Sequence, residues 1–271
     1  MLVDTHCHIN MMVKNSFDTP LQKSDLSKAE IIIGQAQQSR VSLIINVGTR
    51  KIENQNCILL AQTFDPVFAT VGIHPNDSDT WQEDLELMKK WLKNKKENKI
   101  VGIGECGIDM HYPDYNLQRQ RDAFKAQIEL ALEHNLALVV HSRDAYDETL
   151  RVLEEYKNNI ARATMHCFSY DQTFANIVTS WGFMLGIGGP ITYPKNHELR
   201  NVVTNSDLKN IVLETDAPFL PPQEIRGKQN HPKEIAAIAQ FIATLRDESF
   251  EAIAQQTTEN ALKLFNIPRS P

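Results

Sequence analysis

Residues 2–8 read Leu2-Val3-Asp4-Thr5-His6-Cys7-His8, a short apolar run that ends in two histidines. A run of this length with β-branched residues is typical of a buried β-strand. An open, doubly wound sheet would carry a glycine-rich phosphate-binding turn directly after its first strand. His6-Cys7-His8 occupies that position instead, so this stretch favours a closed barrel of parallel strands over an open sheet.

Seven more apolar runs follow, and amphipathic segments separate them. In one of these segments Phe124, Ile128 and Leu132 recur every four residues, which is the pattern of a helix that covers a sheet with one face. This alternation predicts an α/β fold, a single (β/α)8 TIM-like barrel over residues 1–271, with the helices from about residue 231 packing on the barrel. The expected strands are residues 2–6, 42–47, 67–73, 100–105, 137–141, 163–167, 183–187 and 211–215.

The charge balance and the cysteines restrict the class of protein. With 28 Lys and Arg against 34 Asp and Glu, the formal charge is −6, which excludes a globally basic surface for long duplex DNA. A phosphate substrate held by metal ions is still compatible with this charge. The four cysteines form no C-x-x-C pair and are expected to be free thiols. Because the chain lacks a signal-peptide pattern and an apolar run of about 18 residues, we expect a cytoplasmic protein with no membrane contact and no obligate protein partner.

Histidines and carboxylates recur where the expected strands end, and in a barrel these ends meet at one mouth. His6 and His8 are two residues apart, so they point to the same side of a strand and can chelate one ion. Imidazole and carboxylate without thiolate suit Zn²⁺, Mn²⁺ or iron and leave Mg²⁺ open. The cluster offers more ligands than a single tetrahedral ion binds. Two ions about 3.5–4 Å apart that share one carboxylate would use all of them. The candidate ligands are His6, His8, Glu105, His141, His166 and Asp216.

Three further residues are expected to contact a substrate. His74 ends the third expected strand, where it either touches the substrate or shapes a turn with the proline that follows it. Arg143 follows the fifth strand, and Arg226 lies in the loop after the eighth. Guanidinium groups at these positions would neutralise a phosphate near the metals.

Four other residues lie close in sequence to the candidate ligands. Two carboxylates among them have two possible roles each, and two cysteines are expected to be structural. Glu214 and Asp4 each precede a candidate ligand by two residues, so each is either an outer partner of a ligand histidine or a carboxylate paired with a basic group such as Arg162. Cys106 and Cys167 directly follow a candidate ligand, so strand alternation is expected to turn them toward the helices.

Six short motifs lie in a fixed order along the chain. They are Val3-Asp4-Thr5-His6-Cys7-His8, Gly72-Ile73-His74-Pro75, Ile103-Gly104-Glu105-Cys106-Gly107-Ile108-Asp109, His141-Ser142-Arg143-Asp144-Ala145, His166-Cys167-Phe168-Ser169 and Glu214-Thr215-Asp216-Ala217-Pro218. In sequence and order these motifs resemble the TatD family of metal-dependent deoxyribonucleases, a branch of the amidohydrolase superfamily. The resemblance extends from the first strand to Thr257-Thr258-Glu259-Asn260, almost the whole chain.

The resemblance implies a distorted eight-stranded barrel and a particular distribution of ligands. One metal would be bound by His6, His8 and Asp216. The other would be bound by His141 and His166, and Glu105 would bridge both. The implied activity is 3′ to 5′ exonuclease cleavage of single-stranded or nicked DNA.

A phosphodiester would be hydrolysed in such a site by a metal-activated water, with Asp216 as the general base and Glu105 as the bridge. Hydrolysis of a small ester, amide or phosphoester in the same site is the alternative, because one barrel hosts many chemistries. A metal-stabilised binding protein without turnover is a third interpretation.

Two stretches depart from the family pattern. Residues 9–28 form a first loop that is longer than usual in the family. In residues 226–232, Gln229 stands where a basic residue is expected, and His231 stands where an acidic residue is common.

Overall fold

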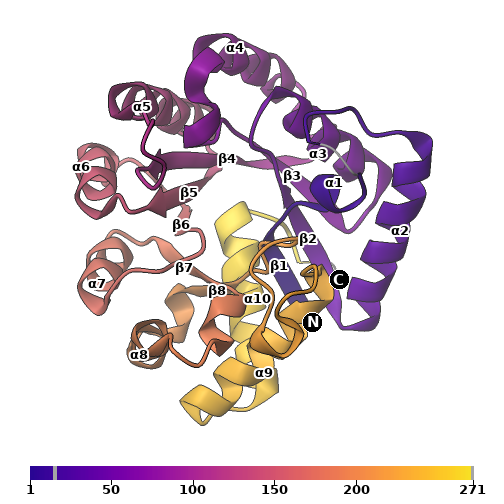
Figure 1. Ribbon diagram of the computed structural model, residues 1–271, viewed down its shortest axis with the longest axis vertical. Coiled ribbons are helices and arrows are strands. Elements are labelled where there is room, and N and C mark those ends of the chain that lie inside the picture. Colours follow the sequence, from indigo (N-terminus) through magenta and orange to yellow (C-terminus); the bar gives the residue numbers. More distant parts are fainter. Residues whose placement is uncertain (15–16, 270–271) are drawn as a thin grey trace.

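Eight parallel strands lie side by side in the order of the chain in the computed structural model, which describes residues 1–14 and 17–269. Helices surround the strands, so the molecule is the predicted (β/α)8 barrel (Figure 1). The strands are β1 Leu2–Cys7, β2 Val41–Val47, β3 Val67–Val71, β4 Ile100–Asp109, β5 Ala137–Arg143, β6 Ala163–Met165, β7 Met184–Ile187 and β8 Ile211–Leu213.

The barrel closes where the end of β1 meets the segment after β8. Cys7 and Ala217 form an isolated parallel bridge, and the backbone N–H of His8 donates to the carbonyl of Ala217 at 2.7 Å. The backbone N–H of Asp216 donates to the carbonyl of His6 at 2.8 Å. The contacts that close the barrel therefore bring three of the candidate ligands to one place.

The helices pack on the outside of the strands through their apolar faces. In α5, Phe124 and Ile128 are fully buried, as the four-residue spacing predicts. The helices are α1 Ile9–Met12, α2 Lys23–Gln38, α3 Lys51–Thr63, α4 Trp81–Leu92, α5 Leu117–His134, α6 Tyr146–Tyr156, α7 Gln172–Ser180, α8 His197–Asn205, α9 Ile235–Arg246 and α10 Phe250–Phe265.

The last helix covers one end of the barrel. Leu264 and Phe265 of α10 are buried in one apolar cluster with Val3, Ala137 and Met184, which lie near the starts of their strands. Because α10 closes the amino-terminal end, the opposite end, where the strands finish, is free to hold a site.

β4 is longer than predicted and continues past Glu105 to Asp109. Two glycines with positive φ let it pass close to β5. A Cβ at Gly104 would lie 2.5 Å from the carbonyl of Val139, and one at Gly107 would lie 1.9 Å from the carbonyl of His141. No other residue type fits at these positions.

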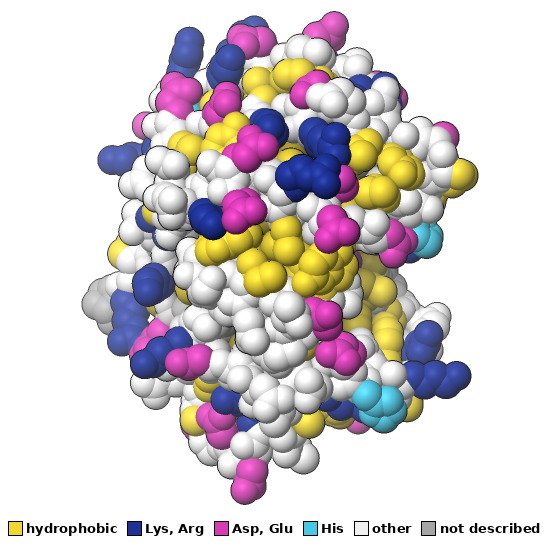
Figure 2. Space-filling model, turned by 90° about the vertical axis from the view of Figure 1, so that its left-hand side faces the viewer, with side chains coloured by type: hydrophobic (Ala, Val, Ile, Leu, Met, Phe, Trp, Pro, Cys, Tyr) yellow, Lys and Arg dark blue, Asp and Glu magenta, His cyan; other side chains and the backbone are white. Residues whose placement is uncertain are grey.

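The outer surface carries charges of both signs. On the face shown in Figure 2, which is the left-hand side of Figure 1, basic and acidic side chains are interspersed and neither sign forms a continuous track. Within the described residues, no helix has the length and apolar character needed to cross a membrane.

Candidate metal centre

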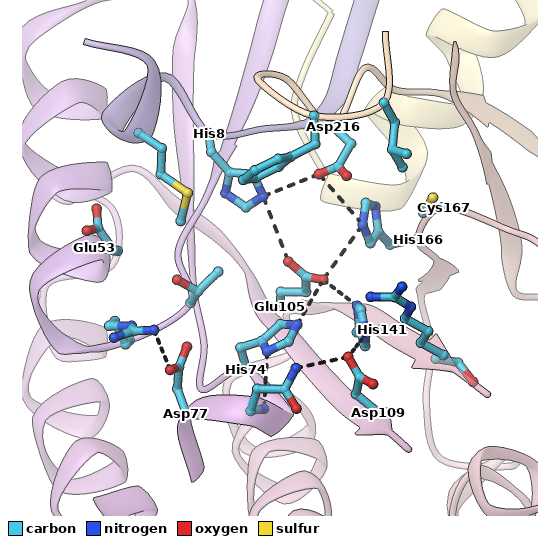
Figure 3. Close-up of a pocket in the computed structure, with 18 of the residues that line it drawn as sticks. His8, Glu53, His74, Asp77, Glu105, Asp109, His141, His166, Cys167 and Asp216 are labelled. Atoms are coloured by element: carbon cyan, nitrogen blue, oxygen red, sulfur yellow. Dashed lines mark hydrogen bonds and ion pairs between the residues drawn. The ribbon is translucent and has the colours of Figure 1, made fainter. Parts of the chain in front are cut away.

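All six candidate ligands meet at the carboxyl ends of the strands, and five of them line a cavity of about 660 Å³ while His6 lies buried beneath it. Glu105 occupies the middle of the group (Figure 3). Its Oε2 lies 3.5 Å from Nε2 of His6 and 3.8 Å from Nε2 of His8. Its Oε1 lies 2.7 Å from Nδ1 of His141 and 3.7 Å from Nε2 of His166. The two oxygens of one carboxylate therefore face two different sets of histidines.

His6, His8 and Asp216 form the first set. The Nε2 atoms of the two histidines are 3.2 Å apart, and Oδ1 of Asp216 lies 3.7 Å and 3.4 Å from them. Nδ1 of His8 is 2.8 Å from the carbonyl of Val47, which can only accept, so this nitrogen carries the proton. The lone pair of His8 Nε2 then points at its neighbours, and a divalent cation between them fits this donor set.

His141 and His166 form the second set, and a carboxylate supports each ring from behind. Nδ1 of His166 lies 2.9 Å from Oε1 of Glu214, and Nε2 of His141 lies 3.3 Å from Oδ2 of Asp109. In both rings the remaining nitrogen faces Glu105. Histidines that bind metals are held in this manner by carboxylates that accept from the other ring nitrogen.

For Glu214 the contacts support the role of an outer partner of a ligand histidine, and for Asp4 they support neither of the two expected roles. Glu214 is the outer partner of His166, while Arg162 donates to the carbonyl of Asn135. Asp4 accepts from the backbone of Thr215 at 2.9 Å and from its hydroxyl at 2.6 Å. Burial raises the pKa of Asp4 to about 8. Asp4 therefore joins β1 to the segment after β8 and does not contact an imidazole ring.

The carboxylates of the site favour a positive charge on His166. Burial opposes protonation of His166, yet the charges of Glu214 and Glu105 raise its pKa to about 10. Burial raises the pKa of the Asp216 carboxyl, but its contact with His8 and the charge of His166 bring this pKa below its ordinary value. A site whose carboxylates stabilise a protonated His166 and are themselves ionised is also suited to cations.

His74 lies beside the two sets as a neutral hydrogen-bond donor. Its Nδ1 accepts from the backbone N–H of Asn76 at 3.2 Å, so Nε2 carries the proton and lies 3.7 Å from Oε1 of Glu105. Burial, together with the charge of His141, lowers the pKa of His74 to about 3. The ring is therefore uncharged near neutral pH, and its N–H points into the cavity.

Cys106 and Cys167 were both expected to face the helices, and this expectation is wrong for Cys167. Cys106 is fully buried, with Sγ 3.6 Å from the carbonyl of Val139, as predicted. Cys167 lines the cavity instead of facing the helices. β6 ends at Met165, and Cys167 has a left-handed backbone with a φ of 46°, so strand alternation no longer sets its direction.

Two of the three predicted substrate contacts lie at the cavity. His74 and Arg143 line it, and the guanidinium of Arg143 lies 5.8 Å from the centre of the Tyr112 ring. Arg226 is not among the described residues that line the cavity, and its guanidinium lies 4.6 Å from the centre of the Tyr193 ring. A substrate contact for Arg226 stays a prediction.

Sequence reasoning missed Arg50 and Asp109. Arg50 lines the cavity and forms an ion pair with Asp77. It follows β2 by three residues, so the rule that singled out residues at strand ends would have found it. Asp109 was missed because β4 was expected to end at Glu105.

Known proteins resemble this chain along almost its whole length. The family model described as TatD related DNase matches residues 3–266. The uncharacterized metal-dependent hydrolase YabD of Bacillus subtilis is 34% identical over 269 residues, which are 98% of this chain and 100% of that protein. A Pantoea ananatis protein named 3′-5′ ssDNA/RNA exonuclease TatD is 32% identical over 247 residues, which are 89% of this chain and 94% of that protein. The crystal structure of YjjV, a TatD homologue from Escherichia coli, matches with a TM-score of 0.88 at 29% identity and covers 98% of each chain. The chain therefore belongs to the TatD family of metal-dependent hydrolases.

Proposed function

We propose that this protein is a deoxyribonuclease that holds two divalent ions, Mg²⁺, Mn²⁺ or Zn²⁺, and removes nucleotides from the 3′ end of single-stranded or nicked DNA. The observation that carries the proposal is the position of Glu105, whose two carboxylate oxygens face different sets of histidines. The proposed ligands of the first ion are His6, His8, Asp216 and Glu105, and those of the second are Glu105, His141 and His166.

The charge of the cavity supports a metal-dependent reaction on a phosphodiester. Five carboxylates and two guanidinium groups line the cavity, so, with the histidines counted as neutral, two divalent cations would change its formal charge from −3 to +1. A phosphate anion would be repelled by the protein alone and attracted by the loaded site. When bound, the cations would stabilise charge on the phosphoryl oxygens and lower the pKa of a water.

The side chains around the proposed ions have distinct tasks in the proposed reaction. Asp216 accepts the proton of the attacking water, since its pKa lies below the ordinary value and its side chain is 14% exposed, against 6% for Glu105. His74 donates from Nε2 to a phosphate oxygen. Arg143 and Arg50 bind the remaining oxygens.

The proposed preference for single-stranded ends rests on the charge of the protein surface and on the name of one relative. A formal charge of −6 and the interspersed charges of Figure 2 do not supply the basic track that binding to a long duplex uses. The Pantoea ananatis relative is named for 3′-5′ cleavage of single-stranded DNA and RNA. RNA is therefore the second substrate to test.

The proposal is tested by incubating the protein with 5′-labelled single-stranded DNA, the matching duplex and the matching RNA, with Mg²⁺, Mn²⁺, Zn²⁺ or EDTA. We expect a ladder that shortens from the 3′ end, requires metal and disappears in Asp216→Asn. Products that shorten from the 5′ end would contradict the polarity. No cleavage by protein with both ions shown to be bound would overturn the nuclease and favour a small ester, amide or phosphoester as substrate.

A further inference from the structure

Exposed apolar side chains gather at the mouth of the cavity. Eight large hydrophobic residues are exposed in the described part of the chain, and four of them line this cavity. Scattered exposed apolar residues need no explanation, but a concentration around a charged floor does. The four are Phe17, Tyr112, Phe219 and Leu220. We refer to the three aromatic residues Phe17, Tyr112 and Phe219 as the aromatic rim.

Phe219 of the aromatic rim lies beside a proposed metal ligand. The centre of its ring lies 6.1 Å from that of His8. Its backbone is fixed on both sides, because its N–H donates to Asp216 at 2.8 Å and its carbonyl accepts from Asn230 Nδ2 at 2.7 Å. The ring is held at the mouth although 44% of the residue is exposed to solvent.

Phe17 comes from residues 9–28, the stretch that is longer than usual. The neighbouring residues are anchored to α3 by the carboxylate of Glu53, which is 1% exposed. Its oxygens accept from Nζ of Lys14 at 2.7 Å and from the backbone N–H of Asp18 at 2.7 Å. This buried ion pair holds Phe17 at the cavity, and it gives the long stretch a position beside the site.

Tyr112 comes from the loop after β4. The guanidinium of Arg143 lies 5.8 Å from the centre of its ring. The adjacent His111 contacts the carboxylate of Asp144 at 2.7 Å, which ties this loop to the end of β5. Tyr112 therefore places a flat ring next to the arginine that is proposed to bind phosphate.

We propose that the aromatic rim stacks on the nucleobase of the terminal nucleotide while its phosphate lies on the floor of the cavity. Aromatic side chains beside a phosphate site bind bases of single-stranded nucleic acids by stacking, with little dependence on sequence. The cavity volume of about 660 Å³ lies in the range of sites that hold one small ligand, so it is large enough for one nucleotide. The inference rests on the proposed function and makes it more specific, because the substrate group that is recognised is a nucleotide.

The test measures binding to the metal-loaded protein and does not require cleavage. Deoxyadenosine 5′-monophosphate and 2-deoxyribose 5-phosphate share the sugar and phosphate, and the base at C1′ of the first is replaced by a hydroxyl group in the second. We expect calorimetry to give at least tenfold tighter binding of the nucleotide. Phe219→Ala should weaken nucleotide binding about tenfold and leave the sugar phosphate unchanged, and Phe219→Trp should restore the difference.

The matched control is Tyr115→Ala, which removes an exposed aromatic residue that is not among those lining the cavity. It should bind both compounds as the wild type does. If Phe219→Ala is unfolded by circular dichroism, Phe17→Ala and Tyr112→Ala test the same rim. Equal affinity of the wild type for both compounds, or equal weakening of both by the rim variants, would overturn the proposal.

The binding and cleavage experiments together distinguish failure of the aromatic-rim proposal from failure of the exonuclease proposal. Binding that depends on the base, without cleavage of any oligonucleotide, would support the rim and reject the exonuclease. Cleavage of DNA without discrimination between the two compounds would support the exonuclease and reject the rim.

Discussion

Nδ1 of His166 lies 2.9 Å from Oε1 of Glu214, and the same oxygen accepts the backbone N–H of Cys167 at 2.6 Å. Glu214 is 1% exposed, and both of these contacts are made by its Oε1. The contact leaves Nε2 of His166 facing Glu105 and Asp216. Glu214 is thus a residue that positions a proposed metal ligand without touching the metal itself.

Replacement of Glu214 is expected to weaken metal binding at the second site. Glu214→Gln keeps the shape of the side chain but removes the charge that favours Nδ1–H on His166. Loss of such a partner costs about 10- to 100-fold in metal affinity. Titration against a competing chelator measures the effect, with the exposed Glu224→Gln as the matched control. Unchanged affinity at both sites would contradict the positioning role.

Removal of Glu105 is expected to affect both sites at once. Glu105→Ala takes away the carboxylate whose two oxygens face different sets of histidines. Elemental analysis of the purified variant should show fewer than one tightly bound ion per chain, whereas Asp216→Asn should retain the ion at the second site. Two tightly held ions in Glu105→Ala would refute the bridge.

Arg143 is expected to act on the substrate and not on the metals. Arg143→Ala removes charge-assisted hydrogen bonds, which contribute about 1.5–3 kcal/mol each, so KM for DNA should rise about tenfold or more. The metal content should stay as in the wild type. The control is Arg151→Ala, an exposed arginine of α6 that pairs with Glu148. Unchanged kinetics in Arg143→Ala would remove this residue from the site.

Stability toward acid is expected to depend on His231, which lies outside the metal centre. Its Nδ1 accepts from the backbone N–H of Lys233 at 3.2 Å, and its Nε2 is buried without a partner among the described residues. Burial, with the charge of Lys233, lowers the pKa of His231 from 6.5 to about 4. The unfolded chain therefore takes up a proton at higher pH than the folded one, and stability is lost as the pH falls from 6.5 toward 4.

His231→Asn keeps an acceptor at the start of the Pro232–Glu234 turn but does not titrate. Urea denaturation of both proteins at several pH values measures the difference in free energy of unfolding. This difference should shift in favour of the variant between pH 6.5 and 4. A constant difference over this range would show that His231 is not the group responsible.

Residue types and their order along the chain were enough to predict the barrel and the six residues, Glu105 among them, that meet at its mouth. Apolar runs identify strands locally, and parallel strands in a barrel all finish at one end. The same reasoning failed where a strand end was misplaced. Cys167 lies beyond the end of β6, and Asp109 still lies within β4. Strand ends depend on pairing with a neighbour, which one segment alone does not reveal.

The sequence by itself determined the eight strands and the chemical character of the residues at their ends, because both follow from local periodicity and composition. The tertiary structure decided which nitrogen of each histidine faces the site, since this depends on partners such as Val47 for His8 and Glu214 for His166. It also decided that Phe17 and Phe219 reach the same cavity. They come from opposite ends of the chain, and only closure of β1 against the segment after β8 brings them together.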